Sequence, residues 1–130
     1  MSQEFNITRI GQVSIPVQNI EQAAKFYHET LGLTLLFQLS NMAFLECNGV
    51  RLMLSVPEHE EYNHPSSIFY FNVEDIHASY ETLLARDVTF LGKPHIIAEM
   101  NGIQTWMAFF RDPDLNTQAL MSEVAASAAQ

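Results

Sequence analysis

An internal repeat constrains the fold of this chain more than any other feature of its sequence. Val17-Gln18-Asn19-Ile20 agrees in residue type with Val73-Glu74-Asp75-Ile76, which begins 56 residues later (17 to 73). In both places an extended, alternating segment precedes the shared stretch and a helical pattern follows it. The sequence therefore predicts two similar halves, each with the order β-α-β-β-β.

The first half carries the patterns of one strand, one helix and three further strands. Apolar and polar residues alternate over residues 9–17, which is the period of a strand. Asn19 is typical of a helix N-cap, and the apolar residues after it recur at helical spacing until Gly32. Asn48-Gly49 is typical of a type I′ hairpin turn. The three further strands are expected at residues 34–40, 42–47 and 50–56.

The second half repeats this order after a polar loop over residues 57–65. Asp75 is its expected helix N-cap, and Asn101-Gly102 its expected hairpin turn. Its strands are expected at residues 66–73, 89–100 with a break at 92–94, 103–110 and 117–123. We expect one domain over residues 1–130, with module one at about 7–57 and module two at about 65–124.

The composition excludes several classes of protein. Hydrophobic residues make up 48% of the chain, which excludes a disordered tail protein. Six Lys and Arg against fifteen Asp and Glu give a formal net charge of −9, which argues against binding to nucleic acid or to an anionic membrane. Cys47 is the single cysteine, so an intramolecular disulfide and a CxxC zinc site are both excluded.

Targeting signals are also not expected. The first five residues are acidic and lack an apolar run, unlike a signal peptide. No stretch approaches the roughly 18 apolar residues of a membrane helix. We therefore expect a cytoplasmic protein, with residues 124–130 frayed.

Three motifs in order carry a family resemblance. The first is Val17-Gln18-Asn19-Ile20 with the later Ala23-Ala24, Phe26-Tyr27 and Leu31-Gly32-Leu33; the others are Phe71-Asn72-Val73-Glu74-Asp75-Ile76 and Phe109-Phe110-Arg111-Asp112-Pro113-Asp114. With this ordered set, the chain resembles the vicinal oxygen chelate superfamily, which includes glyoxalase I, extradiol dioxygenases and bleomycin- and fosfomycin-resistance proteins. The resemblance implies an α+β fold in which two βαβββ modules form a curled, mixed-sheet cup around a small ligand.

Two residues depart from the family pattern. Asp87 stands where a glycine commonly follows the second helix, and an aspartate tolerates the left-handed conformation needed there. Leu115 replaces the glycine of the family's DPDGN turn. Because that conformation is unfavourable for leucine, either this turn differs or the side chain contacts a partner.

The resemblance also implies where a metal would bind. Metal-dependent relatives take their ligands from the first and last strands of each module, at positions that correspond here to Gln12, Met53, Ile68 and Ala119. A catalytic metal needs about three ligands from His, Asp, Glu or Cys, and an amide with a thioether cannot replace them. We therefore expect that the metal site has been lost and that no cofactor is bound.

Strand alternation predicts what lines the cup instead. Side chains on alternate positions face away from the helices, and the cup should therefore be soft and apolar with a few polar groups. By this alternation the expected ligand-binding residues are Gln12, Ser14, Met53, Ile68, Tyr70, Ala119 and Met121. His95 and Trp106 are added to them, because the hairpin at Asn101-Gly102 would bring these two residues close together.

Three kinds of function remain open on this reading. The first is a metal-free member of the family that binds a small organic molecule. The second is an enzyme of the lyase, isomerase or dioxygenase type, with either a non-standard metal site or metal-free acid–base chemistry by His95 and Tyr70. The third is an interaction module whose cup is packed shut. The resemblance further implies a homodimer, and His59 and His64 could hold an adventitious ion.

Overall fold

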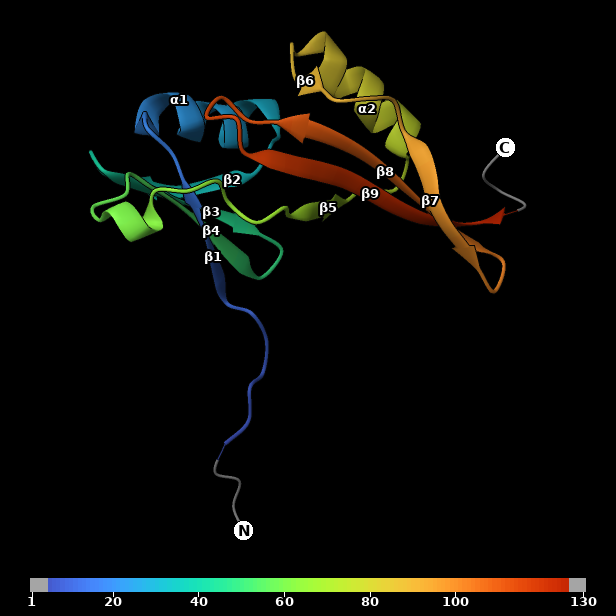
Figure 1. Cartoon of the computed structure of the whole chain (residues 1–130), viewed down its shortest axis with the longest axis horizontal. Coiled ribbons are helices and arrows are strands. Elements are labelled where there is room, and N and C mark those ends of the chain that lie inside the picture. The colour runs from blue at the N-terminus through green and yellow to red at the C-terminus, as the bar shows by residue number, and fades with distance from the viewer. Residues whose placement is uncertain (1–4, 127–130) are drawn as a thin grey trace.

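The structure, a computed structural model, describes residues 5–126 as two open sheets with one α-helix each (Figure 1). The first sheet has the strand order β1-β4-β3-β2; the second has the order β5-β9-β8-β6, with β7 also paired to β8. The first-half elements are β1 (Gln12–Pro16), α1 (Ile20–Lys25), the π-helical η1 (Phe26–Thr30), β2 (Thr34–Gln38), β3 (Met42–Cys47) and β4 (Val50–Ser55). After the short helix η2 (Glu60–Tyr62) come β5 (Tyr70–Asn72), α2 (Ile76–Ala85), β6 (Thr89–Phe90), β7 (His95–Met100), β8 (Ile103–Arg111) and β9 (Thr117–Ala125).

The two halves share one topology, which confirms the predicted repeat. In each, the first strand pairs in parallel with the last, β1 with β4 and β5 with β9, and the other pairs are antiparallel. The expected break over residues 92–94 separates β6 from β7. The second half differs from expectation at two ends, since β5 is only three residues long and β9 continues to Ala125. The prediction of fraying is therefore wrong for Val124 and Ala125, and residues 127–130 lie outside the described residues.

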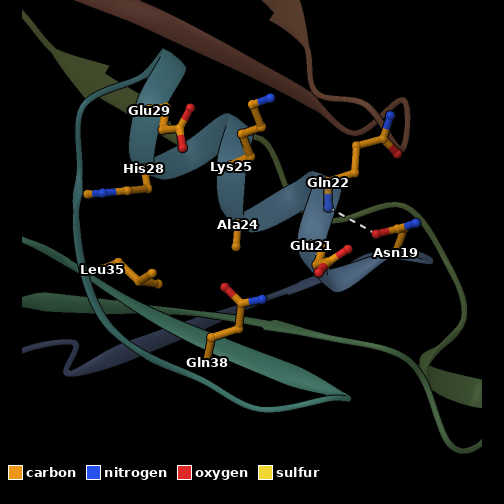
Figure 2. Close-up of a pocket in the computed structure, with 9 residues that line it drawn as sticks. All are labelled: Asn19, Glu21, Gln22, Ala24, Lys25, His28, Glu29, Leu35 and Gln38. Carbon is orange, nitrogen blue, oxygen red and sulfur yellow. Dashed lines mark hydrogen bonds between the residues drawn. The ribbon is translucent and has the colours of Figure 1, made fainter.

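Both α-helices begin at the predicted caps. The Asn19 side chain accepts a hydrogen bond from the backbone N–H of Gln22 at 2.9 Å, drawn as a dashed line in Figure 2. Asp75 accepts the equivalent bond from Ala78 at 3.0 Å. These bonds satisfy N–H groups of the first turn that no helical carbonyl reaches.

The turns use residues that tolerate positive φ, with one exception. Asn48-Gly49 and Asn101-Gly102 have φ of 46° and 98°, and of 55° and 76°, as type I′ hairpins require. Asp87 has φ of 65°, so aspartate takes the place of the family's glycine. Leu115 also keeps the left-handed conformation, at φ of 67°, with its side chain exposed. The turn therefore retains its shape despite the unfavourable residue.

Each half has its own core between its helix and its sheet. The first core combines the apolar face of α1, which includes Ala23, and Tyr27 of η1 with alternate residues of β1, β3 and β4. The second packs α2 against Ala108, Phe110 and Leu120 of the sheet. Phe26 and Phe71 contact both cores and so join the halves.

A buried hydrogen-bond cluster also links the halves. The Tyr27 hydroxyl donates to Asp112 Oδ2 at 2.7 Å, and both residues are almost fully buried. The Asn116 side chain donates to the same oxygen at 3.0 Å and to the carbonyl of Pro16 at 2.9 Å. The backbone N–H of Gln18 donates to Asp114 Oδ1 at 2.8 Å. The motif residues Phe26-Tyr27 and Asp112-Pro113-Asp114 therefore hold one half against the other.

Both α-helices lie on the same side of the molecule, above the sheets in Figure 1. Within residues 5–126, no α-helix lies over the opposite face of either sheet, although the segment of the short helix η2 borders that face of the first sheet, and the sheets do not close around one another. Both sheets expected to build the cup are therefore present in one chain, and each has one open face. None of the helices in the described part of the chain has the length and hydrophobicity needed to cross a bilayer.

Candidate functional site

The uncovered face of the first sheet forms the floor of a cavity of about 560 Å³. Ser14 of β1 and Met53 and Ser55 of β4 line it, as strand alternation predicts for residues that face away from α1. Leu52 and Leu54, between them on β4, are buried in the first core. The floor is therefore a short row of hydroxyl and thioether groups. Its further lining residues include Met42, Val56, Phe69, His59, Tyr62 and His64.

The loop between the two halves forms one wall of this cavity. His59, Tyr62 and His64 come from the polar segment around η2, where the His59 and Tyr62 rings lie 5.9 Å apart. The sequence suggested only a solvated acidic loop or an adventitious ion site for this segment. The sequence feature that could have indicated this wall is the presence of His59, Tyr62 and His64 among the glutamates of the loop.

Two buried amides of the second half anchor the end of this loop. Asn116 Oδ1 accepts from the N–H of Ser66 at 3.0 Å. The fully buried Gln118 accepts from the N–H of Phe69 at 2.7 Å and donates to Ser66 Oγ at 3.1 Å. Phe69 then packs on the first core rather than on α2. The cavity wall is therefore held by β9 and the turn before it, although its floor belongs to the first sheet.

Gln12 and Met53 meet beside the cavity, and Arg51 joins them. Gln12 Nε2 lies 3.7 Å from Met53 Sδ, and Arg51 Nε donates to Gln12 Oε1 at 2.8 Å. The Arg51 guanidinium also lies over the Phe44 ring, 5.5 Å from its centre. The sequence reasoning did not select Arg51, although its position two residues before Met53 places it on the same strand face.

Tyr70 and His95 lie on the second sheet, on opposite sides of one phenylalanine. Their rings are 6.2 and 6.4 Å from that of Phe109, and both side chains are exposed. The Nδ1 atom of His95 is 3.0 Å from the carbonyl of Lys93. Neither residue lines the first-sheet cavity. The structure thus places both predicted catalytic residues on the uncovered face, but away from this cavity.

The remaining predicted ligand residues lie in different surroundings. Trp106 packs against α2, with its ring 4.9 Å from that of His77, and is therefore on the helix-covered face. Ala119 is fully buried and is paired with Tyr70 and Phe109. Met121 is half-buried beside Met107, whereas Ile68 precedes β5 and is exposed. The structure does not gather these residues around the cavity.

Two other hollows lie on the helix side of the sheets. An apolar groove of about 640 Å³ runs between the halves, with Leu31 and Cys47 on one side and Phe71 and Leu83 on the other; the predicted residue Tyr70, on the edge strand β5, also borders this groove. A polar groove of about 620 Å³ lies between α1 and β2 (Figure 2). In this view Ala24 points from the helix toward the strand, and Gln38 points from the strand toward the helix. Its lining is mostly charged and amide groups, which offer little apolar surface to an organic ligand.

Among residues 5–126, burial raises the pKa of three groups, all of them outside the first-sheet cavity. Burial, together with the negative charge of Asp112, raises the pKa of the Tyr27 hydroxyl, so it remains a proton donor to that carboxylate. Burial also raises the pKa of the Cys47 thiol, with a contribution from Glu46, which favours the protonated thiol. The pKa of Asp114 is raised by burial against the opposing hydrogen bond from Gln18. These shifts belong to the structural core and not to a catalytic centre.

The sequence model of the Glyoxalase/Bleomycin resistance protein/Dioxygenase superfamily matches residues 9–119. The chain belongs to this superfamily. No curated protein matches the sequence.

Solved structures of superfamily members share the fold. A glyoxalase/bleomycin resistance protein/dioxygenase from Alicyclobacillus acidocaldarius is 17% identical, with a TM-score of 0.71 over 94% of this chain and 96% of that one. A superfamily member from Sphaerobacter thermophilus is 25% identical, with a TM-score of 0.70 over 89% and 98%. A lactoylglutathione lyase from Agrobacterium tumefaciens is 16% identical, with a TM-score of 0.71 over 90% and 95%. The predicted α+β fold is confirmed.

The residues present do not fit the divalent metal that the superfamily implies. At the four corresponding positions, Ile68 and Ala119 offer no donor atom, and Met53 offers only a neutral thioether. The amide oxygen of Gln12 already accepts a hydrogen bond from a guanidinium, whose positive charge opposes a dication there. Among residues 5–126, no group of three or more His, Cys, Asp or Glu side chains is placed to hold an ion. These side chains therefore do not form a site for a divalent ion.

Proposed function

We propose that this superfamily member binds a small organic molecule in the first-sheet cavity, using its own side chains without a metal ion. The single observation that carries the proposal is the cavity itself, in which methionine, proline and phenylalanine side chains lie among hydroxyl and imidazole groups and the carboxylate of Glu58. Its volume of about 560 Å³ is within the range of small-molecule sites, which is roughly 300–1,000 Å³.

The lining favours a ligand with an apolar, preferably aromatic, body. Met42 and Met53 supply polarisable sulfur that adapts to a flat ring, and Phe69 supplies an aromatic wall. Ser14 and Ser55 offer hydroxyl groups on the floor that can fix the orientation of a polar substituent. Binding is favoured over metal-free catalysis because His95 and Tyr70 lie away from this cavity.

The proposal also covers the domain organisation, the oligomeric state and the location of the protein. Both halves build it, so we propose that the modules act together as one domain. The open second face, with Tyr70 and Phe109 on it, supports a homodimer in which that face is covered. We also propose a cytoplasmic location, in keeping with the single cysteine, and the net charge of −9 supports a protein that binds neither nucleic acid nor an anionic membrane.

A pair of methionine variants tests the proposal. The protein is dialysed against a chelator and screened by ligand-observed NMR with small aromatic molecules such as indole, naphthalene-2-carboxamide and 2-naphthoate. Met53→Trp places a larger side chain on the cavity floor and should weaken the affinity of bound molecules by about tenfold or more, because the indole ring occupies the space that a ligand needs. Met100→Trp, at the exposed end of β7, is the matched control and should leave affinity unchanged.

Three results would overturn the proposal. They are binding that needs an added divalent cation, binding that Met53→Trp does not weaken, and no binding of any of these molecules. Thermal unfolding of both variants shows whether the substitution at Met53 affects the cavity alone. If Met53→Trp does not fold, Ser14→Leu replaces it in the test, because this substitution fills the same floor.

A further inference from the structure

Arg51 is a fixed positive charge on the uncovered face of the first sheet, next to the cavity. Its backbone pairs with both neighbouring strands, opposite Gln12 on β1 and Glu46 on β3. The chain has only six Lys and Arg residues against fifteen Asp and Glu. Arg51 is the one basic residue of the first sheet's four strands. The positive charge at this position of the sheet therefore needs an explanation from the residues around it.

Two contacts fix where the guanidinium lies. Its Nε donates to Gln12 Oε1 at 2.8 Å, and its central carbon is 5.5 Å from the centre of the Phe44 ring. Phe44 is the cross-strand partner of Met53, so the guanidinium leans along the sheet toward the cavity floor. The aromatic contact and the hydrogen bond already restrict the Arg51 side chain. Less conformational entropy is therefore lost when a ligand binds to it.

The same contacts leave most of the guanidinium available to a ligand. The bond to Gln12 uses Nε, while the two terminal nitrogens carry four further N–H groups. Glu46, the acidic residue opposite Arg51 on β3, accepts a hydrogen bond from the N–H of Gly49 at 2.5 Å. Within residues 5–126, the terminal nitrogens have no hydrogen-bond partner, and a planar guanidinium matches the two oxygens of a carboxylate.

We propose that Arg51 binds the carboxylate of an aromatic or apolar acid whose body lies in the first-sheet cavity, with Gln12 as the residue that positions it. This inference rests on the proposed function, since the cavity supplies the site for the body of the ligand. It assigns the charged end to a residue that lies outside the cavity lining. The guanidinium thereby takes the place, beside Gln12 and Met53, that the superfamily resemblance gives to a metal ion.

Matched acids and amides test the inference. Benzoate, phenylacetate and 2-naphthoate, each with its neutral carboxamide, are titrated at pH 7 into the chelator-dialysed full chain, and the dissociation constants are measured by NMR. At this pH the acids are ionised, while each amide keeps nearly the same shape. In the wild-type protein at least one acid should bind about tenfold more tightly than its amide, as expected for a charge-assisted pair. Acetate, which has no apolar body, should not bind measurably.

Substitutions then assign the preference to Arg51. Arg51→Gln should bring each acid to within about twofold of its amide while leaving amide affinity unchanged. Lys25→Gln makes the same change in net charge on α1, on the other side of the sheet, and should leave the preference intact. Arg51→Lys keeps the charge without the planar fork and should retain only part of the preference. This variant also provides the measurement if Arg51→Gln does not fold.

The outcomes separate the inference from the proposed function. If amides bind in the cavity but no acid binds more tightly, or if Arg51→Gln keeps the acid preference, the inference is wrong and the proposed function stands. Acetate binding as tightly as the aromatic acids would also contradict it, because the cavity would then contribute nothing. If neither acids nor amides bind, both are wrong.

Discussion

The two halves of the molecule are alike where the helices cover them and different where they are open. Both helices begin after a residue whose side chain accepts a hydrogen bond from the backbone N–H three residues later. In both sheets the first strand of the half pairs in parallel with the last strand. The open face of the first sheet carries Gln12, Arg51 and a cavity floor. The open face of the second carries aromatic rings around Phe109. The helix side thus maintains the fold, and the open side is where the halves have acquired different chemistry.

The first way to break this comparison is to separate the halves, which should have the largest effect. Asp112→Ala removes the acceptor of the Tyr27 hydroxyl and of two backbone N–H groups in its own turn, and leaves buried donors unpaired. We expect a loss of about 3–5 kcal/mol in the free energy of unfolding, measured by chemical denaturation. Asp75→Ala, which removes only a helix cap, should cost about 1 kcal/mol. Equal losses for the two variants would mean that the halves do not depend on each other.

The second way is to detach the loop that one half supplies to the other's cavity. Gln118→Ala removes the hydrogen bonds to Phe69 and Ser66 from a fully buried position, and should cost about 2–3 kcal/mol. It should also increase the rate of proteolysis within residues 57–67 and weaken ligand binding, because the wall of the cavity loses its anchor. Gln104→Ala, which removes an amide near the β7–β8 hairpin, is the control. An unchanged proteolysis rate would contradict the assigned role of Gln118.

The caps, turns and strand faces could be predicted from the sequence because each depends on residues close together in the chain. Asn19, Asp75 and the two Asn-Gly turns act locally, and alternation correctly separated Ile15 and Leu54 from Ser14 and Met53. The position of Trp106 was also available from alternation, since it shares its parity on β8 with the core residues Ala108 and Phe110. The hairpin motif obscured this by suggesting proximity to His95.

Other features depend on contacts between distant residues and could not be predicted. The shortness of β5 follows from the hydrogen bonds of Gln118 and Asn116, which bind residues 66–69 as a loop instead of a strand. The role of the loop as a cavity wall depends on the same bonds. Arg51 was overlooked because its importance comes from Gln12 and Phe44, on neighbouring strands.

A third prediction concerns the turn in which the second half departs from the family pattern. Leu115 holds φ of 67° with its side chain 68% exposed, a conformation that costs a branched residue about 1–2 kcal/mol. Leu115→Gly relieves this strain at an entropic cost of about 0.5–1 kcal/mol, so stability should rise by up to about 1 kcal/mol. Asp87→Gly, at φ of 65°, should gain less, because aspartate tolerates this region. A loss of stability in Leu115→Gly would instead indicate that the leucine makes a stabilising contact, such as one with a partner chain.

The smallest effect is expected at Asp114, the carboxylate with a raised pKa that accepts a hydrogen bond from Gln18 of the other half. Because burial raises the pKa of Asp114, the folded state keeps this proton at pH values where the unfolded state, with a pKa near 3.9, has lost it. The Asp114 contribution to stability therefore falls as the pH rises from about 3.9 through the raised pKa. Asp114→Asn should remove this fall, measured as the difference between the two proteins in unfolding free energy from about pH 3.5 to pH 6. A difference that is independent of pH would contradict the assignment.

The central claim is that the open face of the first sheet binds an organic molecule by its own side chains. The most direct test is a map of backbone amide chemical shifts for the chelator-dialysed protein as 2-naphthoate is added. The account predicts shifts concentrated at Ser14, Arg51, Met53 and Ser55, with little change in α2. Shifts that arise only after a divalent cation is added, or that centre on Tyr70, His95 and Ala119, would contradict it.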